Sequence, residues 1–326
     1  MSENNIESNN NTYLKVIDVR KKNKMTQAEL AKKAGISLKT LSRYENGEKI
    51  SFNSEKKLLI TLEIDNAQSL ENYAEKNKYS FDNQAEEYNK FEFIIKKEYI
   101  EKIINAGYPY KNKKVLDLGC GTGMLAIETA KYAKEVYALD ISKAMTEKLK
   151  KDCIEKKIDN IIAVEGDAHN LQFEDNTFDT VITRLAVHHF ANPHIIFSEI
   201  KRVLKNFGEL ILVDIVASED KEEAILQDTF NKIRDFSHNR FYTLNEIKKF
   251  LKDNSFIEAK IQTWKTEREF YDWISLSNFK DPNNLLFNIM RGFALNNIDI
   301  GTNLRLENNE IRFDQKMVLI KVTNIK

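Results

Sequence analysis

A glycine-rich turn preceded by an aspartate is the clearest candidate for chemistry in this sequence. The segment 117–123, Asp-Leu-Gly-Cys-Gly-Thr-Gly, begins within the short apolar run 115–118. Glycine lets a backbone turn tightly and approach a ligand closely, and carboxylates accept hydrogen bonds from hydroxyl and amino groups. Asp140 and Asp167 end the next two apolar runs. Three such aspartates around a glycine turn predict a binding site for a polar cofactor.

Alternating strand and helix patterns must position these residues. Strands are expected at 115–118, 135–139, 161–164, 178–183, 209–215, 258–263 and 311–323. Between them, Ser142 is placed to cap one helix, and Asn192, followed by Pro193, to cap another. Residues 218–255 and 264–297 are expected to be largely helical insertions. This alternation predicts a Rossmann-like α/β domain with a seven-stranded, mostly parallel sheet, whose carboxyl edge binds the ligand.

The glycine spacing separates two kinds of nucleotide-cofactor site. A dinucleotide site requires G-x-G-x-x-G. Here Gly119, Gly121 and Gly123 form G-x-G-x-G, and Met124 stands where the third glycine would be. The pattern therefore disfavours a dehydrogenase.

The motif V-L-D-L-G-C-G-T-G at 115–123, with Asp140 and Asp167 at the following strand ends, resembles the class I S-adenosylmethionine (SAM) dependent methyltransferases. The resemblance is strongest to the small-molecule group related to ubiquinone and menaquinone biosynthesis. It runs from about Phe81 to the C-terminus and implies that SAM is the cofactor. We therefore assign residues 80–326 to a methyltransferase domain.

The resemblance also implies a role for individual residues. Asp117 would hold the amino-acid part of SAM, Asp140 both ribose hydroxyls, and Asp167 the adenine amino group. Phe81-Asp82-Asn83-Gln84-Ala85-Glu86-Glu87-Tyr88 resembles a helix that covers the cofactor in this group, with Tyr88 against SAM. The expected cofactor-binding residues are Tyr88, Asp117, Gly119, Gly121, Gly123, Asp140, Ile141, Asp167, Ala168 and Arg184.

Histidines are the candidate general bases, which are needed only if the methyl acceptor must lose a proton. His188 and His189 follow the fourth expected strand, in a loop that faces the transferring methyl group in this fold. His238 lies in Arg-Asp-Phe-Ser-His-Asn-Arg at 234–240, which resembles an R-D-P-S-H-x-R segment of some relatives. Phe236 replaces the proline of that segment. We take His188 and His238 as the catalytic candidates; the alternative for each is a core or loop histidine. No metal site is expected.

The N-terminal part of the chain has helical signals of its own. Thr26 and Glu29 form a capping box, Gly35 allows a tight turn, and Ser37 is the next N-cap. A first helix is expected near residues 14–20, and a closing helix at 52–64. Residues 1–12 are expected to be a disordered leader, 13–66 a small helical domain, and 67–79 a linker.

The stretch 25–47, M-T-Q-A-E-L-A-K-K-A-G-I-S-L-K-T-L-S-R-Y-E-N-G, resembles the phage-repressor and Cro-type helix-turn-helix domains of the XRE family. The resemblance implies that residues 37–43 enter the major groove of DNA. Lys39 and Arg43 would contact bases or phosphates, and Gln27 would hold a phosphate; Ser37 is the fourth expected DNA-binding residue. Such modules usually act as dimers. Binding to a protein instead of DNA is the alternative.

Charge is unevenly distributed along this chain. Lys and Arg together number 50, as do Asp and Glu, yet residues 14–66 carry 12 basic and 7 acidic side chains. A basic N-terminal module therefore precedes a mildly acidic body. Two cysteines, no apolar signal-peptide core and no long apolar run predict a cytoplasmic protein without a membrane span.

Three functions remain open at this point. The favoured one is a methyltransferase for small molecules joined to a DNA-binding module. A DNA methyltransferase is disfavoured, because Pro109, Pro193 and Pro282 are the only prolines, and none belongs to an N-P-P-Y or Pro-Cys motif. The third is a transcription regulator whose second domain only senses SAM or a metabolite. That domain keeps all the expected glycines and aspartates, which favours activity.

Overall fold

The computed structural model describes residues 12–48, 50, 54, 58, 61–62, 67–86, 97–275, 277, 279 and 281–326. The chain divides into two compact units, Met1–Asn72 and Tyr73–Lys326. Of the expected leader, only Thr12 is described, and it begins the first helix. None of the helices in these ranges has the length and apolarity needed to cross a membrane.

Three short helices form the described core of the first unit: α1 (Thr12–Lys22), α2 (Gln27–Ala34) and α3 (Leu38–Glu45). The expected capping box is present, because Thr26 accepts from the Glu29 N–H and Glu29 accepts from the Thr26 N–H. Gly35 has φ 62° and turns the chain from α2 toward α3. Ser37 caps α3 by accepting from the Thr40 N–H.

Apolar side chains from all three helices meet in one small core. Val16, Leu30 and Leu41 are fully buried there. Leu58 and Leu62, from the segment expected to form the closing helix, are buried with them. Most of that segment, 52–64, lies outside the described residues, so the closing helix stays a prediction.

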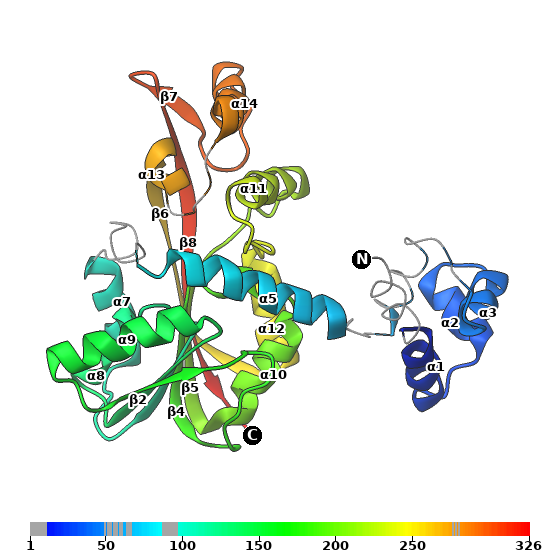
Figure 1. The fold of residues 1–326 in the computed structure, drawn as a ribbon, viewed down its shortest axis with the longest axis horizontal. Coiled ribbons are helices and arrows are strands. Elements are labelled where there is room, and N and C mark those ends of the chain that lie inside the picture. The colour runs from blue at the N-terminus through cyan, green and yellow to red at the C-terminus, as the bar shows by residue number, and fades with distance from the viewer. Residues whose placement is uncertain are drawn as a thin grey trace, which may run out of the picture. The chain divides into compact units, whose positions relative to one another are not determined.

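The second unit is built on one sheet with strand order β3-β2-β1-β4-β5-β8-β6 and a short β7 paired to β8 (Figure 1). The strands β1 to β5 pair in parallel, and β8 runs antiparallel to β5, β6 and β7. The mostly parallel Rossmann-like sheet is confirmed, with β7 as an eighth, unforeseen strand. The strands are β1 (Lys114–Leu118), β2 (Glu135–Asp140), β3 (Ile161–Glu165), β4 (Phe178–Arg184), β5 (Leu204–Ile215), β6 (Phe256–Glu269), β7 (Arg305–Glu307) and β8 (Glu310–Asn324).

Helices cover both faces of this sheet. Successive strand residues point to opposite faces, and apolar residues on both faces are buried under helices. Leu116 and Leu118 of β1 pack in a core with α10 and α12, while Val115 packs on the other face with α7, α8 and α9. The helices are α7 (Lys97–Gly107), α8 (Met124–Ala130), α9 (Lys143–Lys156), α10 (Pro193–Val203), α11 (Lys221–Arg234), α12 (Leu244–Asp253), α13 (Phe270–Ser275) and α14 (Leu285–Leu295), with short 3-10 turns at η2 (Val187–His189) and η3 (Pro282–Asn284).

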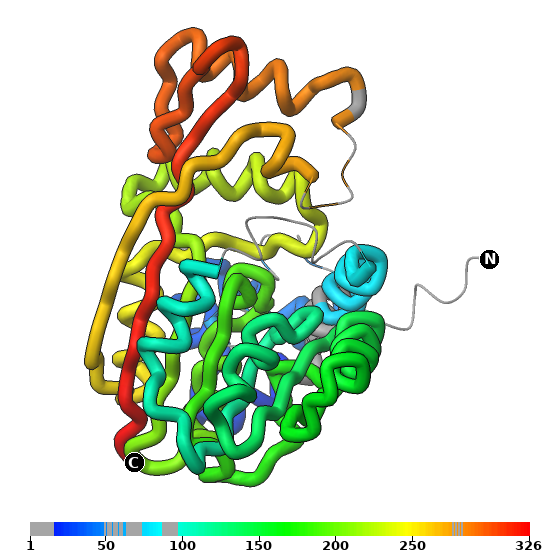
Figure 2. The backbone as a smooth tube through the Cα atoms, turned by 90° about the vertical axis from the view of Figure 1, so that its left-hand side faces the viewer, coloured from blue at the N-terminus to red at the C-terminus, as the bar shows by residue number. Residues whose placement is uncertain are grey.

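The strands β6 and β8 run side by side beyond the rest of the sheet, up to α13 and α14 (Figures 1 and 2). This moves the expected boundary between the strand and the helical insertion, because 264–269 continue β6, while α13, η3 and α14 lie within 270–295 as expected. The buried positions of this extension include Thr266 and Arg268. Its period of two is carried by polar side chains and is invisible in a hydrophobicity pattern. The insertion 218–255 also contains a non-helical stretch, 235–243, between α11 and α12.

The expected linker at 67–79 is helical. It belongs to α5 (Ala67–Gln84), which crosses the division between the two units. The covering helix expected to start at Phe81 is therefore only the end of a longer one, and Ala85 and Glu86 already form a turn. The sequence of α5 is mostly polar, so its helical period was weak. Its residues Ala74, Asn77 and Phe81 line a pocket of the second unit.

Candidate functional site

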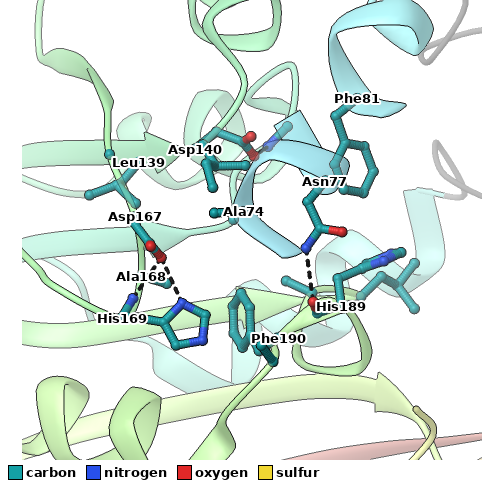
Figure 3. Close-up of a pocket in the computed structure, with 17 residues that line it drawn as sticks. Ala74, Asn77, Phe81, Leu139, Asp140, Asp167, Ala168, His169, His189 and Phe190 are labelled. Carbon is teal, nitrogen blue, oxygen red and sulfur yellow. Dashed lines mark hydrogen bonds and ion pairs between the residues drawn. The ribbon is translucent and has the colours of Figure 1, made fainter. Parts of the chain in front are cut away.

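A pocket of about 690 Å³, its open mouth included, lies at the carboxyl edge of the sheet (Figure 3). Its floor is the glycine turn after β1 and the end of β2, and helix α5 contributes Ala74, Asn77 and Phe81 to its wall. A volume of this size is typical of small-molecule and cofactor sites. Of the expected cofactor residues, those that line the pocket are Gly119, Gly121, Asp140, Ile141, Asp167 and Ala168.

The glycine turn is shaped by left-handed backbone angles and close neighbours. Gly119 has φ 70°, and a Cβ there would lie 2.7 Å from the Ala186 Cβ. Gly123 has φ 80° but does not line the pocket; a Cβ there would collide with Leu149 of α9. Gly119 therefore keeps the pocket wall open, whereas Gly123 allows α8 and α9 to pack closely.

Asp140 lies at the centre of the floor, with both carboxylate oxygens held by backbone groups. One oxygen accepts from the Gly121 N–H at 2.7 Å and the other from the Ser142 N–H at 2.9 Å. Burial raises the pKa of Asp140 and nearby Asp82 adds to this, while the backbone N–H groups oppose it. Each carboxylate oxygen keeps a second lone pair, so Asp140 can still accept from a ligand.

Asp117 lies under the glycine turn on β1, and its side chain does not line the pocket. It is 2% exposed, and its Oδ2 atom has no hydrogen-bond partner. Burial raises the pKa of Asp117 to about 7, and the charge of Asp140 acts in the same direction, while Arg184 opposes it. Arg184 does not line the pocket either. A buried carboxylate with an open acceptor is suited to hold a cationic or hydrogen-bond-donating group.

Asp167 stands at the far side of the pocket and pairs with His169. Its Oδ1 accepts from the His169 N–H at 2.9 Å and contacts the ring Nδ1 at 2.7 Å (Figure 3). Burial alone would raise the pKa of Asp167, but these two bonds outweigh it and hold the pKa below its usual value. The aspartate therefore stays charged and retains free lone pairs beside Ala168.

Helix α5 is tied down over the pocket at three points. The Asn77 side chain donates to the His189 carbonyl at 2.9 Å (Figure 3). Asp82 accepts from the Ser142 hydroxyl at 2.6 Å and from the Ala144 N–H at 3.1 Å, and Lys78 pairs with Glu165. None of these contacts was expected from the sequence. The sequence motif at 81–88 predicted only the end of this helix. Tyr88, the residue of that motif expected against SAM, lies outside the described residues.

The two catalytic candidates do not line the pocket, whereas His189 does. His188 contacts Asp214 through Nδ1 at 2.6 Å, and His238 contacts Asp228 through Nε2 at 3.0 Å. The His189 Nδ1 donates to the Ser237 carbonyl at 2.9 Å, which leaves Nε2 as the acceptor atom. Burial, followed by the neighbouring His188, lowers the pKa of His189, so its ring is neutral at physiological pH.

The expected DNA-binding residues of the first unit are mostly exposed. Lys39 and Arg43 both stand in solvent on α3, and Ser37 caps that helix. Arg43 pairs with Glu48 at 2.7 Å, a contact in which both side chains are about half exposed. Gln27 differs, because its amide donates to Glu45 at 2.8 Å. Arg20 also binds Glu45, through two bonds of 2.6 and 2.7 Å, so one N–H of Gln27 serves an internal network.

Comparisons with known proteins agree with both units. Residues 116–212 match the family model of a methyltransferase domain, and residues 16–64 match that of a helix-turn-helix. A methyltransferase of Bacillus subtilis, YcgJ, is 31% identical over 198 residues, which is 61% of this chain and 78% of that protein. A demethylmenaquinone methyltransferase of Thermotoga maritima is 29% identical over 43% of this chain and 62% of its own.

Solved structures agree as well. The crystal structure of YcgJ superposes with a TM-score of 0.66 at 28% identity, covering 70% of this chain and 98% of that one. The crystal structure of a methyltransferase from Bacillus halodurans gives the same score at 26% identity, covering 70% and 99%. The two families expected from the sequence are confirmed. The chain therefore belongs to the methyltransferase family and carries a helix-turn-helix domain ahead of its methyltransferase domain.

Proposed function

We propose that the second unit transfers a methyl group from SAM to a small molecule in the cytoplasm, and that the first unit binds DNA and makes the protein a regulator or directs it to a DNA site. The observation that carries the first half is the convergence of the glycine turn, Asp140 and Asp167 on one pocket, with the buried Asp117 on the strand that leads into the glycine turn.

The residues present fit SAM in chemistry and space. Asp117 has a buried oxygen without a partner, which suits the amino group of the cofactor or a water bound to it. Asp140 has lone pairs left for two ribose hydroxyls, and Asp167, charged and beside Ala168, suits the adenine amino group. A Cβ at Gly119 would collide with Ala186, which also lines the pocket, and would take up space that the cofactor needs. These roles are proposals for each residue, as is the position of Tyr88.

When bound, SAM supplies a methyl group on a positively charged sulfur, already activated for transfer. The chain's own task is then to hold the acceptor in line and to exclude water. Helix α5, tied to His189, Ser142 and Glu165, closes the pocket. If the acceptor carries a proton on its reacting atom, we assign the hydrogen-bond acceptor for that proton to Nε2 of His189 in place of His188 or His238, because only His189 of these three lines the pocket. The lowered pKa of His189 makes this nitrogen a weak base.

A labelling experiment tests this function. Cell extract is incubated with the full-length protein and methyl-labelled SAM, and the label is followed separately into small molecules, protein and nucleic acid. Label in the small-molecule fraction supports the proposal, and label in DNA would replace it with the DNA methyltransferase alternative. SAM binding without any transfer would favour the alternative of a SAM-sensing regulator. An Asp140→Ala protein is the negative control.

DNA binding by the first unit is the second part of the proposal. It is supported by the exposed Lys39 and Arg43 on α3 and by the match to the helix-turn-helix family. The exposed pair of Arg43 with Glu48 is of a kind worth ~0–1 kcal/mol, so Arg43 can exchange Glu48 for a base or phosphate at little cost. Selection of genomic fragments on the immobilised protein, followed by sequencing, tests this part. Absence of any enriched sequence would favour a protein-binding module.

A further inference from the structure

A second hollow lies next to the cofactor pocket, between helix α5 and the segment that follows α11. It has a volume of about 940 Å³, its open mouth included. Lys76, Tyr79 and Ser80 of α5 form one side, and Arg234, Asp235 and Phe236 form the other. We call it the acceptor groove. Its second side belongs to the Arg-Asp-Phe-Ser-His-Asn-Arg segment at 234–240, none of whose residues lines the cofactor pocket.

Arg234 is the unusual residue of this groove. It is only 9% exposed, and its Nε has no hydrogen-bond partner. Its Nη1 donates to the Trp273 carbonyl at 3.2 Å, and its Nη2 lies 3.6 Å from the Asp235 carboxylate, too far for a good hydrogen bond. The guanidinium also stacks over the Trp273 ring, 5.0 Å from its centroid. A buried cation held this loosely is costly unless an anion completes its shell.

The charges around Arg234 do not compensate it fully. The carboxylate of Asp235 is engaged by its own loop, since its Oδ1 accepts from the Ser237 N–H at 2.8 Å and the Ser237 hydroxyl at 2.6 Å. The charged residues that line the groove are Lys76, Arg234 and Asp235, a net charge of +1 among the described lining residues. Burial lowers the pKa of Arg234, which agrees with a guanidinium short of partners.

The groove also offers apolar surface. Phe236 and Tyr79 are 72% and 75% exposed, and the Lys76 ammonium lies 5.8 Å from the centroid of the Phe236 ring. Exposed aromatic rings beside a cation suit a ligand with a flat apolar body and a charged end. Arginine binds carboxylate and phosphate groups through paired hydrogen bonds.

One short loop joins the groove to the cofactor pocket. Asp235 faces the groove, and the carbonyl of Ser237, two residues on, accepts from the ring of His189, which lines the cofactor pocket. A molecule anchored at Arg234 would therefore lie on the same wall that positions His189.

We propose that the acceptor groove binds the anionic end of the methyl acceptor, a molecule with a carboxylate or phosphate on an apolar body. This inference rests on the proposed methyltransferase function and specifies its substrate class. Arg234 is the main binding residue, Lys76 adds positive charge, and Phe236 and Tyr79 contact the apolar part.

Equilibrium binding to the full-length protein, saturated with S-adenosylhomocysteine, tests the proposal. The probes are 3-phenylpropionate, phenyl phosphate and the neutral 3-phenylpropanol, measured by ligand-observed NMR. We expect at least one of the anions to bind at least tenfold more tightly than the alcohol. The Arg234→Gln protein should lose this preference, and Lys76→Gln should reduce it several-fold. The Arg240→Gln control should keep it, because Arg240 is in the same segment but pairs with Glu246 outside the groove.

The outcomes separate this inference from the proposed function. Affinity for S-adenosylhomocysteine is measured first and alone; its absence would contradict the cofactor assignment whatever the probes do. With that affinity intact, equal binding of both anions and the alcohol would overturn the anion site. A preference that survives in both Arg234→Gln and Lys76→Gln would overturn it as well. If Arg234→Gln does not fold, the decision rests on Lys76→Gln, whose side chain is on one helix and is not part of the core.

Discussion

In the helix-turn-helix unit Lys39 and Arg43, expected to touch DNA, stand in solvent, whereas in the methyltransferase unit Asp117 and Asp140 are largely withdrawn from it. Arg43 and its partner Glu48 are each about half exposed, while Asp117 is 2% and Asp140 8% exposed. Water stabilises the charges of the first unit before any partner arrives. The pocket carboxylates lack that help, and burial raises the pKa of both. Substitutions of Lys39 or Arg43 should therefore act on partner binding alone, whereas substitutions of Asp117 or Asp140 should act on both binding and stability.

The largest effect is expected from Asp140→Ala. The variant removes the acceptor for two ribose hydroxyls and leaves the Gly121 and Ser142 N–H groups without their partner. A loss of ~2–4 kcal/mol in SAM binding is expected, or roughly 30- to 1000-fold in affinity. Titration calorimetry measures it, with Asp159→Ala, an exposed carboxylate of the same unit, as the control. Unchanged affinity in Asp140→Ala would contradict the assignment of the ribose site.

Asp117→Asn should change stability and binding in opposite directions. The folded state holds the proton of Asp117 more tightly than the unfolded state, since its pKa is raised to about 7 from an ordinary 3.8. Stability of the unliganded protein should therefore fall as the pH rises from about 4 through 7, and the variant should lack that contribution. At pH 8 we expect Asp117→Asn to be ~1–3 kcal/mol more stable and to bind SAM more weakly.

Urea unfolding followed by tryptophan fluorescence measures this effect in the full chain. The two tryptophans, Trp264 and Trp273, both belong to the second unit, so the signal reports that unit alone. A variant that is less stable than the wild type at pH 8 would show that the buried carboxylate is well compensated in the free protein.

Arg43→Ala should weaken binding to the selected DNA sequence by ~1–3 kcal/mol and bring it closer to binding of random DNA, because a base contact is lost. The comparison variant is Lys24→Ala, an exposed lysine expected to contact only phosphate. It should weaken all sequences about equally. Fluorescence anisotropy with both DNAs, at low and high salt, measures the two effects. Equal losses on both DNAs for Arg43→Ala would make Arg43 another phosphate contact.

The smallest effects are expected from two glutamates of the first unit, the buried Glu45 and the exposed Glu48. Glu45→Gln removes the charge that Arg20 and Gln27 share, at a side chain only 6% exposed, and should cost ~1–3 kcal/mol of stability. Glu48→Gln removes the exposed partner of Arg43 and should cost less than ~1 kcal/mol. Hydrogen exchange of the α2 and α3 amides measures both. Equal loss of protection would mean that burial does not distinguish the two pairs.

The glycine turn and the aspartates at strand ends were predictable because their pattern is local. Each aspartate lies in or just after an apolar run, and parallel strands bring their carboxyl ends to one edge. The capping box of Thr26 and the turn at Gly35 were predictable for the same reason. Both are set by residues within a few positions of one another.

The residues that close the pocket were not predictable, because their partners are distant in sequence. Asn77 contacts the His189 carbonyl across 112 positions, and no periodicity reveals such a bond. Which of two adjacent histidines lines the pocket depends on the short turn η2 and on Ser237, far along the chain. The alternation of buried and exposed residues in the β6 extension was not predictable either, because its buried residues Arg268 and Thr266 are of types that are usually exposed.

Helix α5 also determines where this protein can be cut. The division between the units falls between Asn72 and Tyr73, inside the helix, while Ala74, Asn77 and Phe81 of the same helix line the cofactor pocket. A fragment beginning at Ser80 should bind S-adenosylhomocysteine at least tenfold more weakly than one beginning at Ala67, as titration calorimetry can measure. The helix that leads into the second unit therefore also forms part of the wall of its cofactor pocket. A later loss of the module in evolution would therefore have to spare the helix that connected it.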